Sequence, residues 1–201
     1  MSSGHHSSKS SRTLAGRLDQ EAKVSSADCY QCGKCTAGCP AASEMDFRPS
    51  EVMRMLQLEL PQHEKKLLTS KAIWMCVGCE TCYSRCPKKV DLPRAMDFLR
   101  EEALAQGLAH KEATDVQAFH RAFLNSIAGR GRVYEFGMIA EFKRRTGRVF
   151  QDVTLGAPMM MKGKISLLPH AAKDKKAVAR IMARVKAKAE AKAKARKEAR
   201  S

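Results

Sequence analysis

The chain has 201 residues, of which 44% are hydrophobic and only 5% are aromatic. This length suits one ordinary domain with an appendage and is too short for a multidomain enzyme. The formal net charge is +16, and residues 171–201 alone carry twelve Lys or Arg against three acidic residues. Because no apolar run approaches 18 residues and the first thirty hold no signal-peptide core, we expect a cytoplasmic protein with no membrane span.

The sequence of the first half of the chain predicts a flexible arm followed by a helical domain. Residues 1–26 are polar and Ser-rich, which predicts a flexible N-terminal arm. Residues 27–110 carry all eight cysteines, and the spacer between the cysteine blocks shows helical periodicity. A helix start is predicted at Phe47-Arg48-Pro49-Ser50-Glu51, a second helix over 62–69, and a third that opens at Asp91-Leu92-Pro93.

The sequence of the second half of the chain predicts further helices and almost no β-strand. Residues 111–170 are expected to form a helical extension that docks a partner, with helices near 111–128, 133–145 and 159–168. Residues 171–201 are a Lys/Ala/Arg-rich segment, which predicts a basic helical tail with no core face beyond about residue 186. The fold class expected from the whole pattern is all-α.

The cysteines form two blocks of identical spacing, C-x2-C-x2-C-x3-C-P. Eight cysteines in a chain with no export signal are more typical of metal binding or redox chemistry than of structural disulfides. The first block consists of Cys29, Cys32, Cys35 and Cys39, and the second of Cys76, Cys79, Cys82 and Cys86.

This spacing is typical of proteins that hold two [4Fe-4S] clusters, in which the last cysteine of each run ligates the other cluster. We therefore expect one cluster on Cys29, Cys32, Cys35 and Cys86, and the other on Cys76, Cys79, Cys82 and Cys39. Zinc sites use two separated cysteine pairs, so four thiols within eleven residues fit zinc poorly.

No motif for a nucleotide, a flavin, a haem or a substrate accompanies the cysteines. Two electron carriers without a catalytic constellation indicate an electron-transfer subunit of an oxidoreductase complex. We expect that the subunit has no catalytic site of its own and that the chemistry takes place in partner subunits.

The residues around the cysteines resemble the small iron-sulfur subunit of heterodisulfide reductase (HdrC) over roughly residues 27–170. The similarity includes Arg48-Pro49-Ser50-Glu51-Val52-Met53-Arg54, Trp74-Met75-Cys76-Val77-Gly78-Cys79 and Gly131-Arg132-Val133-Tyr134-Glu135. The resemblance implies an α-helical ferredoxin-like fold that relays electrons between two other subunits of a heterodisulfide-reductase-like complex. One of these bears a flavin, and the other is catalytic and rich in cysteine. The resemblance implies no role for the Ser-rich arm or the basic tail.

Two other interpretations remain open at this stage. One is the iron-sulfur subunit of a quinone-linked dehydrogenase complex, and the other is a zinc-dependent nucleic-acid-binding protein. The basic tail would attract phosphates, but it has no aromatic residues on which bases could stack, so we expect no nucleic-acid partner. Met159, Met160 and Met161 are expected either in a core or on a docking surface.

Overall fold

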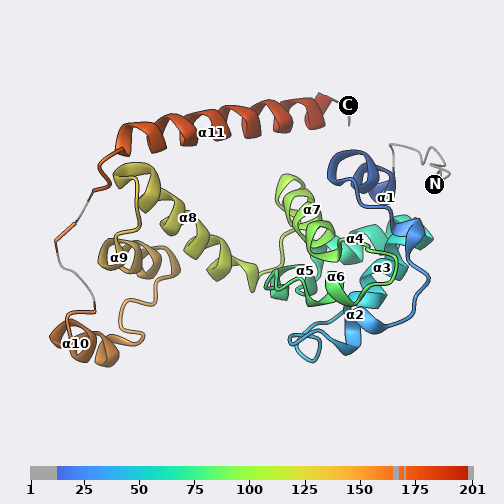
Figure 1. Cartoon of the computed structure of the whole chain (residues 1–201), viewed down its shortest axis with the longest axis horizontal. Helices are drawn as coiled ribbons and strands as arrows, with labels where there is room; N and C mark the ends of the chain where they lie inside the picture. Colours follow the sequence, from blue (N-terminus) through green and yellow to red (C-terminus); the bar gives the residue numbers. More distant parts are fainter. Residues whose placement is uncertain (1–12, 165–167, 170, 199–201) are drawn as a thin grey trace. The chain divides into compact units, whose positions relative to one another are not determined.

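A computed structural model describes residues 13–164, 168–169 and 171–198, and within these ranges every regular element is a helix (Figure 1). The all-helical expectation is therefore confirmed for the described part of the chain. The chain divides into two compact units, one that ends at Ala113 and one that begins at Thr114. The elements of the first unit are α1 (Leu14–Arg17), the π-helix η1 (Leu18–Ala22), the 3-10 helix η2 (Ser26–Asp28), α2 (Lys34–Ala37), α3 (Pro49–Leu58), α4 (Pro61–Thr69), α5 (Ala72–Met75), α6 (Thr81–Arg85) and α7 (Leu92–Ala105).

The long helices of the first unit begin where the sequence predicts. Pro49 occupies the first turn of α3, and the Glu51 carboxylate accepts a hydrogen bond from the Arg48 backbone N–H at 2.6 Å. Asp91 caps α7 by accepting from the Arg94 N–H at 3.0 Å. Helix α3 ends at Leu58, and Pro61 begins α4, which covers the second helix predicted over 62–69.

The segment before the first cysteine block differs from the flexible arm that the sequence predicts. Residues 1–12 lie outside the described residues, but Leu14 and Leu18 are fully buried. Their spacing of four residues places them on one side of the helical turn, and the polar composition around them conceals this short apolar face. The Arg17 guanidinium also lies 2.9 Å from the buried Glu102 carboxylate on α7. This segment is therefore part of the core.

The core of the first unit lies between α3, α4, α7 and the N-terminal turns. Helix α7 contacts α4, α5 and η1, while α3 contacts α4 and η2. Close packing of these faces fixes the ends of the elements that carry the cysteines. The largest apolar side chains with almost no exposure are Leu14, Leu18, Val52, Met53, Leu56, Leu67, Ile73, Met96 and Leu99.

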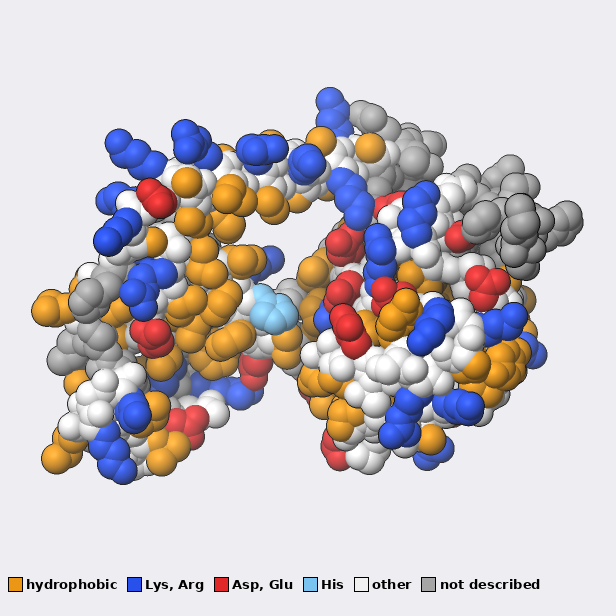
Figure 2. Space-filling model, in the orientation of Figure 1, with side chains coloured by type: hydrophobic (Ala, Val, Ile, Leu, Met, Phe, Trp, Pro, Cys, Tyr) orange, Lys and Arg blue, Asp and Glu red, His pale blue; other side chains and the backbone are white. Residues whose placement is uncertain are grey.

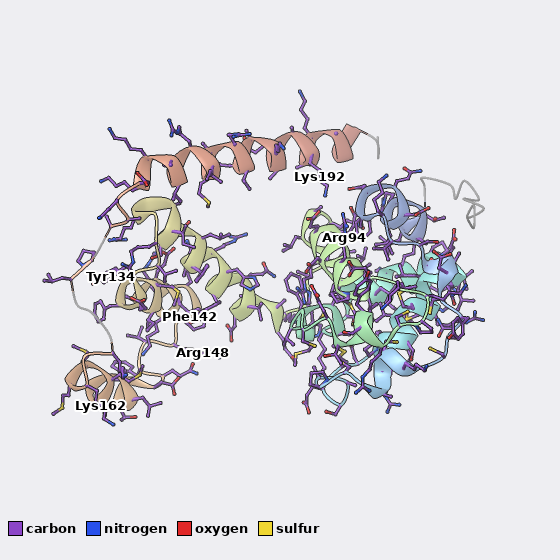
Figure 3. All side chains as sticks on the ribbon, viewed as in Figure 1. Arg94, Tyr134, Phe142, Arg148, Lys162 and Lys192 are labelled. Carbon is purple, nitrogen blue, oxygen red and sulfur yellow. The ribbon has the colours of Figure 1, made fainter. Side chains whose placement is uncertain are left out.

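The second unit is a looser helical assembly. Phe119 packs against Phe123 and Phe142, and the Ser126 hydroxyl accepts from the buried Tyr134 N–H at 2.8 Å. Tyr134 and Phe142 are labelled in Figure 3. The three methionines at 159–161 are exposed, so they form no core. The elements are α8 (Ala113–Arg130), α9 (Glu135–Thr146), α10 (Val153–Met161) and α11 (Lys175–Glu198).

One helix in this unit differs from expectation. Of the helix expected near 159–168, residues 159–161 form the end of α10, which begins at Val153 and contains Pro158, and residues 165–167 lie outside the described residues. The basic segment joins the preceding helices through the Ala172 N–H, which donates to the Arg130 carbonyl at 2.9 Å. Lys and Arg side chains project along α11 (Figure 2). No helix within the described ranges is long and apolar enough to cross a membrane.

Candidate iron-sulfur site

The two cysteine blocks adopt the same backbone conformation. Cys29 follows η2 and Cys76 follows α5, so each block begins directly after a short helical turn. The residues two and four positions after these cysteines have φ angles of +60° and +74° in the first block, and of +65° and +58° in the second. The left-handed residues are Gln31, Gly33, Gly78 and Glu80. The repeat in spacing is therefore also a repeat in three dimensions.

Each curl leads into a very short helix that carries the third cysteine. Cys35 lies on α2 and Cys82 on α6, and the two helices contact each other. Gly38 lies against the Arg85 side chain of α6, because a Cβ atom there would lie 2.7 Å from Arg85 Cδ. A larger residue at this position would require the Arg85 side chain to shift.

The last cysteine of the first block lies with the thiols of the second block. A hollow of about 400 Å³, part of which is open solvent, is lined by Cys39 together with Cys76, Cys79 and Cys82. Its other walls are mostly apolar. They include Met45, Pro49, Leu92, Pro93 and Met96. The arrangement supplies one set of four sulfur atoms drawn from both blocks.

Tyr30 links the last cysteine of the second block to the first block. Partial desolvation and the negative charges of the Cys32 and Cys86 thiolates raise the pKa of the Tyr30 hydroxyl. One cysteine from each block therefore acts on the charge state of this one phenol. The Val90 backbone N–H also donates to Cys86 Sγ at 3.4 Å. N–H donors to sulfur are one means by which a protein sets the potential of an iron-sulfur cluster.

The Cys82 thiol of the second block has a strongly raised pKa. Burial and the negative charge of Cys76 raise the pKa of Cys82 to about 11, with a further contribution from Cys35. Burial likewise raises the pKa of Cys35. Iron–sulfur ligation requires thiolates, so a metal that binds here must displace these protons.

Three polar side chains that no sequence motif marks as functional hold the backbone around the cysteines. Gln57 on α3 donates to the Cys29 carbonyl, and Arg100 on α7 donates to the Cys76 carbonyl. Asp46 accepts from the Ser70 hydroxyl and from the N–H groups of Lys71 and Ala72 at the start of α5. Their distance in sequence from the cysteines leaves no local signal that could have identified them.

The donors of each set suit a cluster, because [4Fe-4S] groups take four cysteine thiolates on four different iron atoms. Among the residues that the structure describes, no three His, Cys, Asp or Glu side chains are grouped as around a single metal ion. The hollow itself is lined by one thiol of the first block and three of the second, with largely apolar walls around them.

Known proteins that are similar to this chain are iron-sulfur proteins. Residues 25–90 match the family model of a 4Fe-4S dicluster domain. The HdrC iron-sulfur subunit of the CoB–CoM heterodisulfide reductase of Methanopyrus kandleri is 37% identical over 102 residues, which are 51% of this chain and 52% of that protein. Another HdrC relative, from Methanocaldococcus jannaschii, is 39% identical over 87 residues, which are 42% of this chain and 45% of that protein.

A third relative is the HdrC protein of the H2:CoB-CoM heterodisulfide,ferredoxin reductase of Methanothermobacter thermautotrophicus. It is 34% identical over 86 residues, or 41% of this chain and 45% of that protein. The matched segment spans about half the length of the curated relatives. Over that segment, which includes a 4Fe-4S dicluster domain, the chain is similar to the HdrC iron-sulfur subunit of heterodisulfide reductases.

Proposed function

We propose that the chain is an electron-transfer subunit that holds two [4Fe-4S] clusters in an α-helical ferredoxin-like domain. The cysteines would be shared crosswise between the blocks. One cluster takes Cys29, Cys32, Cys35 and Cys86, and the other takes Cys76, Cys79, Cys82 and Cys39. The observation that carries the proposal is the meeting of Cys39 with the three thiols of the second block in one hollow.

Features of both cysteine blocks support crossed ligation. The negative charges of Cys32 and Cys86, which belong to different blocks but to the same proposed set, both raise the pKa of the Tyr30 hydroxyl. The contact between α2 and α6 brings the third cysteines of both blocks near each other, and the negative charge of Cys35 reaches Cys82. The chain thus keeps both sets of ligands within one small unit.

The groups that surround the thiols suit an electron carrier. When bound, each cluster would accept and release one electron at a time. The protein supplies thiolates, an N–H donor to sulfur, and apolar walls from Met45, Leu92 and Met96 that lower the local dielectric constant. The site offers thiols and walls that suit electron transfer, so catalysis belongs to other subunits.

The partners in this proposal come from the resemblance to HdrC. The chain would pass electrons between the flavin-bearing subunit of a heterodisulfide-reductase-like complex and its disulfide-active, cysteine-rich catalytic subunit. The three curated relatives are all named as subunits of reductases that act on the CoB–CoM heterodisulfide. Transfer of that role to this chain is part of the proposal.

Anaerobic isolation of the full chain from its native source tests both levels of the proposal. We expect a brown protein with about eight iron and eight labile sulfide per chain, in which reduction produces an EPR signal of [4Fe-4S]⁺ clusters. Colourless material that contains zinc would refute the cluster assignment. Co-purification with a flavoprotein and a cysteine-rich protein supports the complex. Co-purification with a membrane cytochrome instead would refute those partners while leaving the clusters in place.

A further inference from the structure

The two cysteine blocks are supported by equivalent contacts from chemically different side chains. In the first block, Gln57 Nε2 donates to the carbonyl of Ser26 at 2.9 Å and to that of Cys29 at 2.5 Å. These carbonyls belong to the first cysteine of the block and to the residue three positions before it. A side chain on α3 thus holds the end of η2 and the start of the cysteine curl.

The second block repeats this contact with a charged group. Arg100 Nε donates to the Ile73 carbonyl at 2.5 Å, and Arg100 Nη2 donates to the Cys76 carbonyl. Ile73 is again three positions before the first cysteine of its block. The supporting residue now lies on α7 and carries a full positive charge where the first block has a neutral amide.

We propose that Arg100 is a positioning residue that raises the reduction potential of the cluster on the second block above that of the cluster on the first. This inference rests on the proposed function. Reduction adds one negative charge to a cluster, and a fixed cation beside a ligand stabilises the reduced form. Transfer of one electron from the first cluster to the second, which oxidises one and reduces the other, is then favourable.

The burial of Arg100 makes its charge effective. Its side chain is 21% exposed, so water screens it less than it screens a surface cation. Two acidic groups oppose it. Glu80 lines the hollow but is exposed, and Asp97 lies 2.9 Å from Arg100 Nη1 with a side chain that is 69% exposed. Because solvent surrounds both carboxylates, they reduce the effect of the guanidinium but do not cancel it.

The test is an EPR-monitored redox titration of the iron-loaded full chain and of its variants. We expect two midpoint potentials, of which the Cys79→Ser substitution moves the higher. Arg100→Gln, which copies the first block, should lower that midpoint so that the equilibrium constant for electron transfer between the clusters falls about tenfold, or 59 mV for one electron. Asp97→Asn should shift the same midpoint upward.

Arg94→Gln is the matched control. Arg94 lies on the same helix with an exposed side chain (Figure 3), and its substitution removes the same charge, so both midpoints should stay at their wild-type values. A fully loaded Arg100→Gln protein with unchanged midpoints overturns the proposal but leaves the proposed function standing. The proposal also fails if Cys79→Ser moves the lower midpoint, a result that needs no Arg100 variant.

A purely structural role for Arg100 gives a different outcome. If Arg100→Gln and Arg100→Lys both lose the iron of the second block, the guanidinium only holds the backbone, and the proposal is refuted. If Arg100→Lys keeps its iron and a midpoint near that of the wild type, the charge is the cause. Wild-type protein without iron would instead refute the proposed function itself.

Discussion

Asp46 stabilises the turn that leads into the second cysteine block, and its replacement by Asn should have a measurable cost. The carboxylate accepts from the Ser70 hydroxyl at 2.7 Å, the Ala72 N–H at 2.8 Å and the Lys71 N–H at 3.1 Å. Ser70 and Ala72 are buried, so their donors have little access to water. Hydrogen bonds to charged groups each contribute about 1.5–3 kcal/mol.

Asp46→Asn keeps one acceptor oxygen but removes the charge and places an amide donor near the Lys71 N–H. Because the carboxylate is partly exposed, we take the lower end of the range and expect a loss of about 2 kcal/mol. For a unit of this size that corresponds to a melting temperature about 8 °C lower. The measurement is an anaerobic thermal melt of the iron-loaded protein by circular dichroism, at one fixed heating rate.

The pH dependence supplies a second check on this reasoning. Burial raises the pKa of Asp46, but the hydrogen bonds from Ser70, Ala72, Lys71 and Phe47 together outweigh it and lower the pKa below its usual value. A carboxylate with a lowered folded pKa contributes its full stabilisation above its unfolded pKa of about 3.9, and loses it as the pH falls through the folded value. The difference between wild type and Asp46→Asn should therefore be the same at pH 8 and pH 6.

Asp91→Asn is the matched control, because Asn caps a helix about as well as Asp. Asp91 is the N-cap of α7, and its carboxylate accepts a single hydrogen bond, from the Arg94 N–H at 3.0 Å. Its variant should melt within about 2 °C of the wild type, since the expected change is a few tenths of a kcal/mol. Equal losses from both substitutions, or a difference for Asp46 that changes between pH 8 and pH 6, would refute the account given for Asp46.

Three further changes test other parts of the first unit. Cys86→Ser should alter the same EPR signal as Cys32→Ser, and an effect confined to the other signal would contradict crossed ligation. Glu80 has a φ of +58°, a conformation that glycine adopts more easily. Glu80→Gly should therefore raise the melting temperature by relieving about 0.5–1 kcal/mol of strain. An unchanged or lower melting temperature would count against strain at this residue. Glu102→Gln should cost about 2 kcal/mol by leaving the Arg17 charge uncompensated, and hydrogen exchange should then become faster in residues 13–28 but not in α8.

The sequence predicted much of the first unit because its signals are local. Pro49 and Asp91 mark the starts of α3 and α7, and apolar periodicity gives their buried faces. The packing of residues 13–26 was missed, because Leu14 and Leu18 are its only large side chains that are fully buried, and their partners lie far along the chain. Glu102, the partner of Arg17, is 85 residues away. Burial of this kind depends on tertiary contacts that a short window of sequence does not contain.

The sequence predicts a set of ligands for the candidate site but does not predict the side chains that support them. Cysteine spacing predicts which thiols belong together, because the ligation rule depends on short separations. Gly38 has a φ of −101°, which any residue can adopt, so its small size matters because the Arg85 side chain lies against it. That role depends on the second block's approach, which no feature near Gly38 encodes.

The contrast between Gln57 and Arg100 shows where the repeat departs from symmetry. Both side chains hold the carbonyl of the first cysteine in a block, yet one is 28 residues after that cysteine and the other 24. A comparison of the blocks by fixed spacing therefore aligns the cysteines but not their supports. Since the curls themselves match in φ, the surrounding helices are free to differ in charge without changing ligand geometry. Equivalent geometry with unequal charge would give two otherwise similar clusters different reduction potentials, and electron transfer from the lower to the higher would then be favourable.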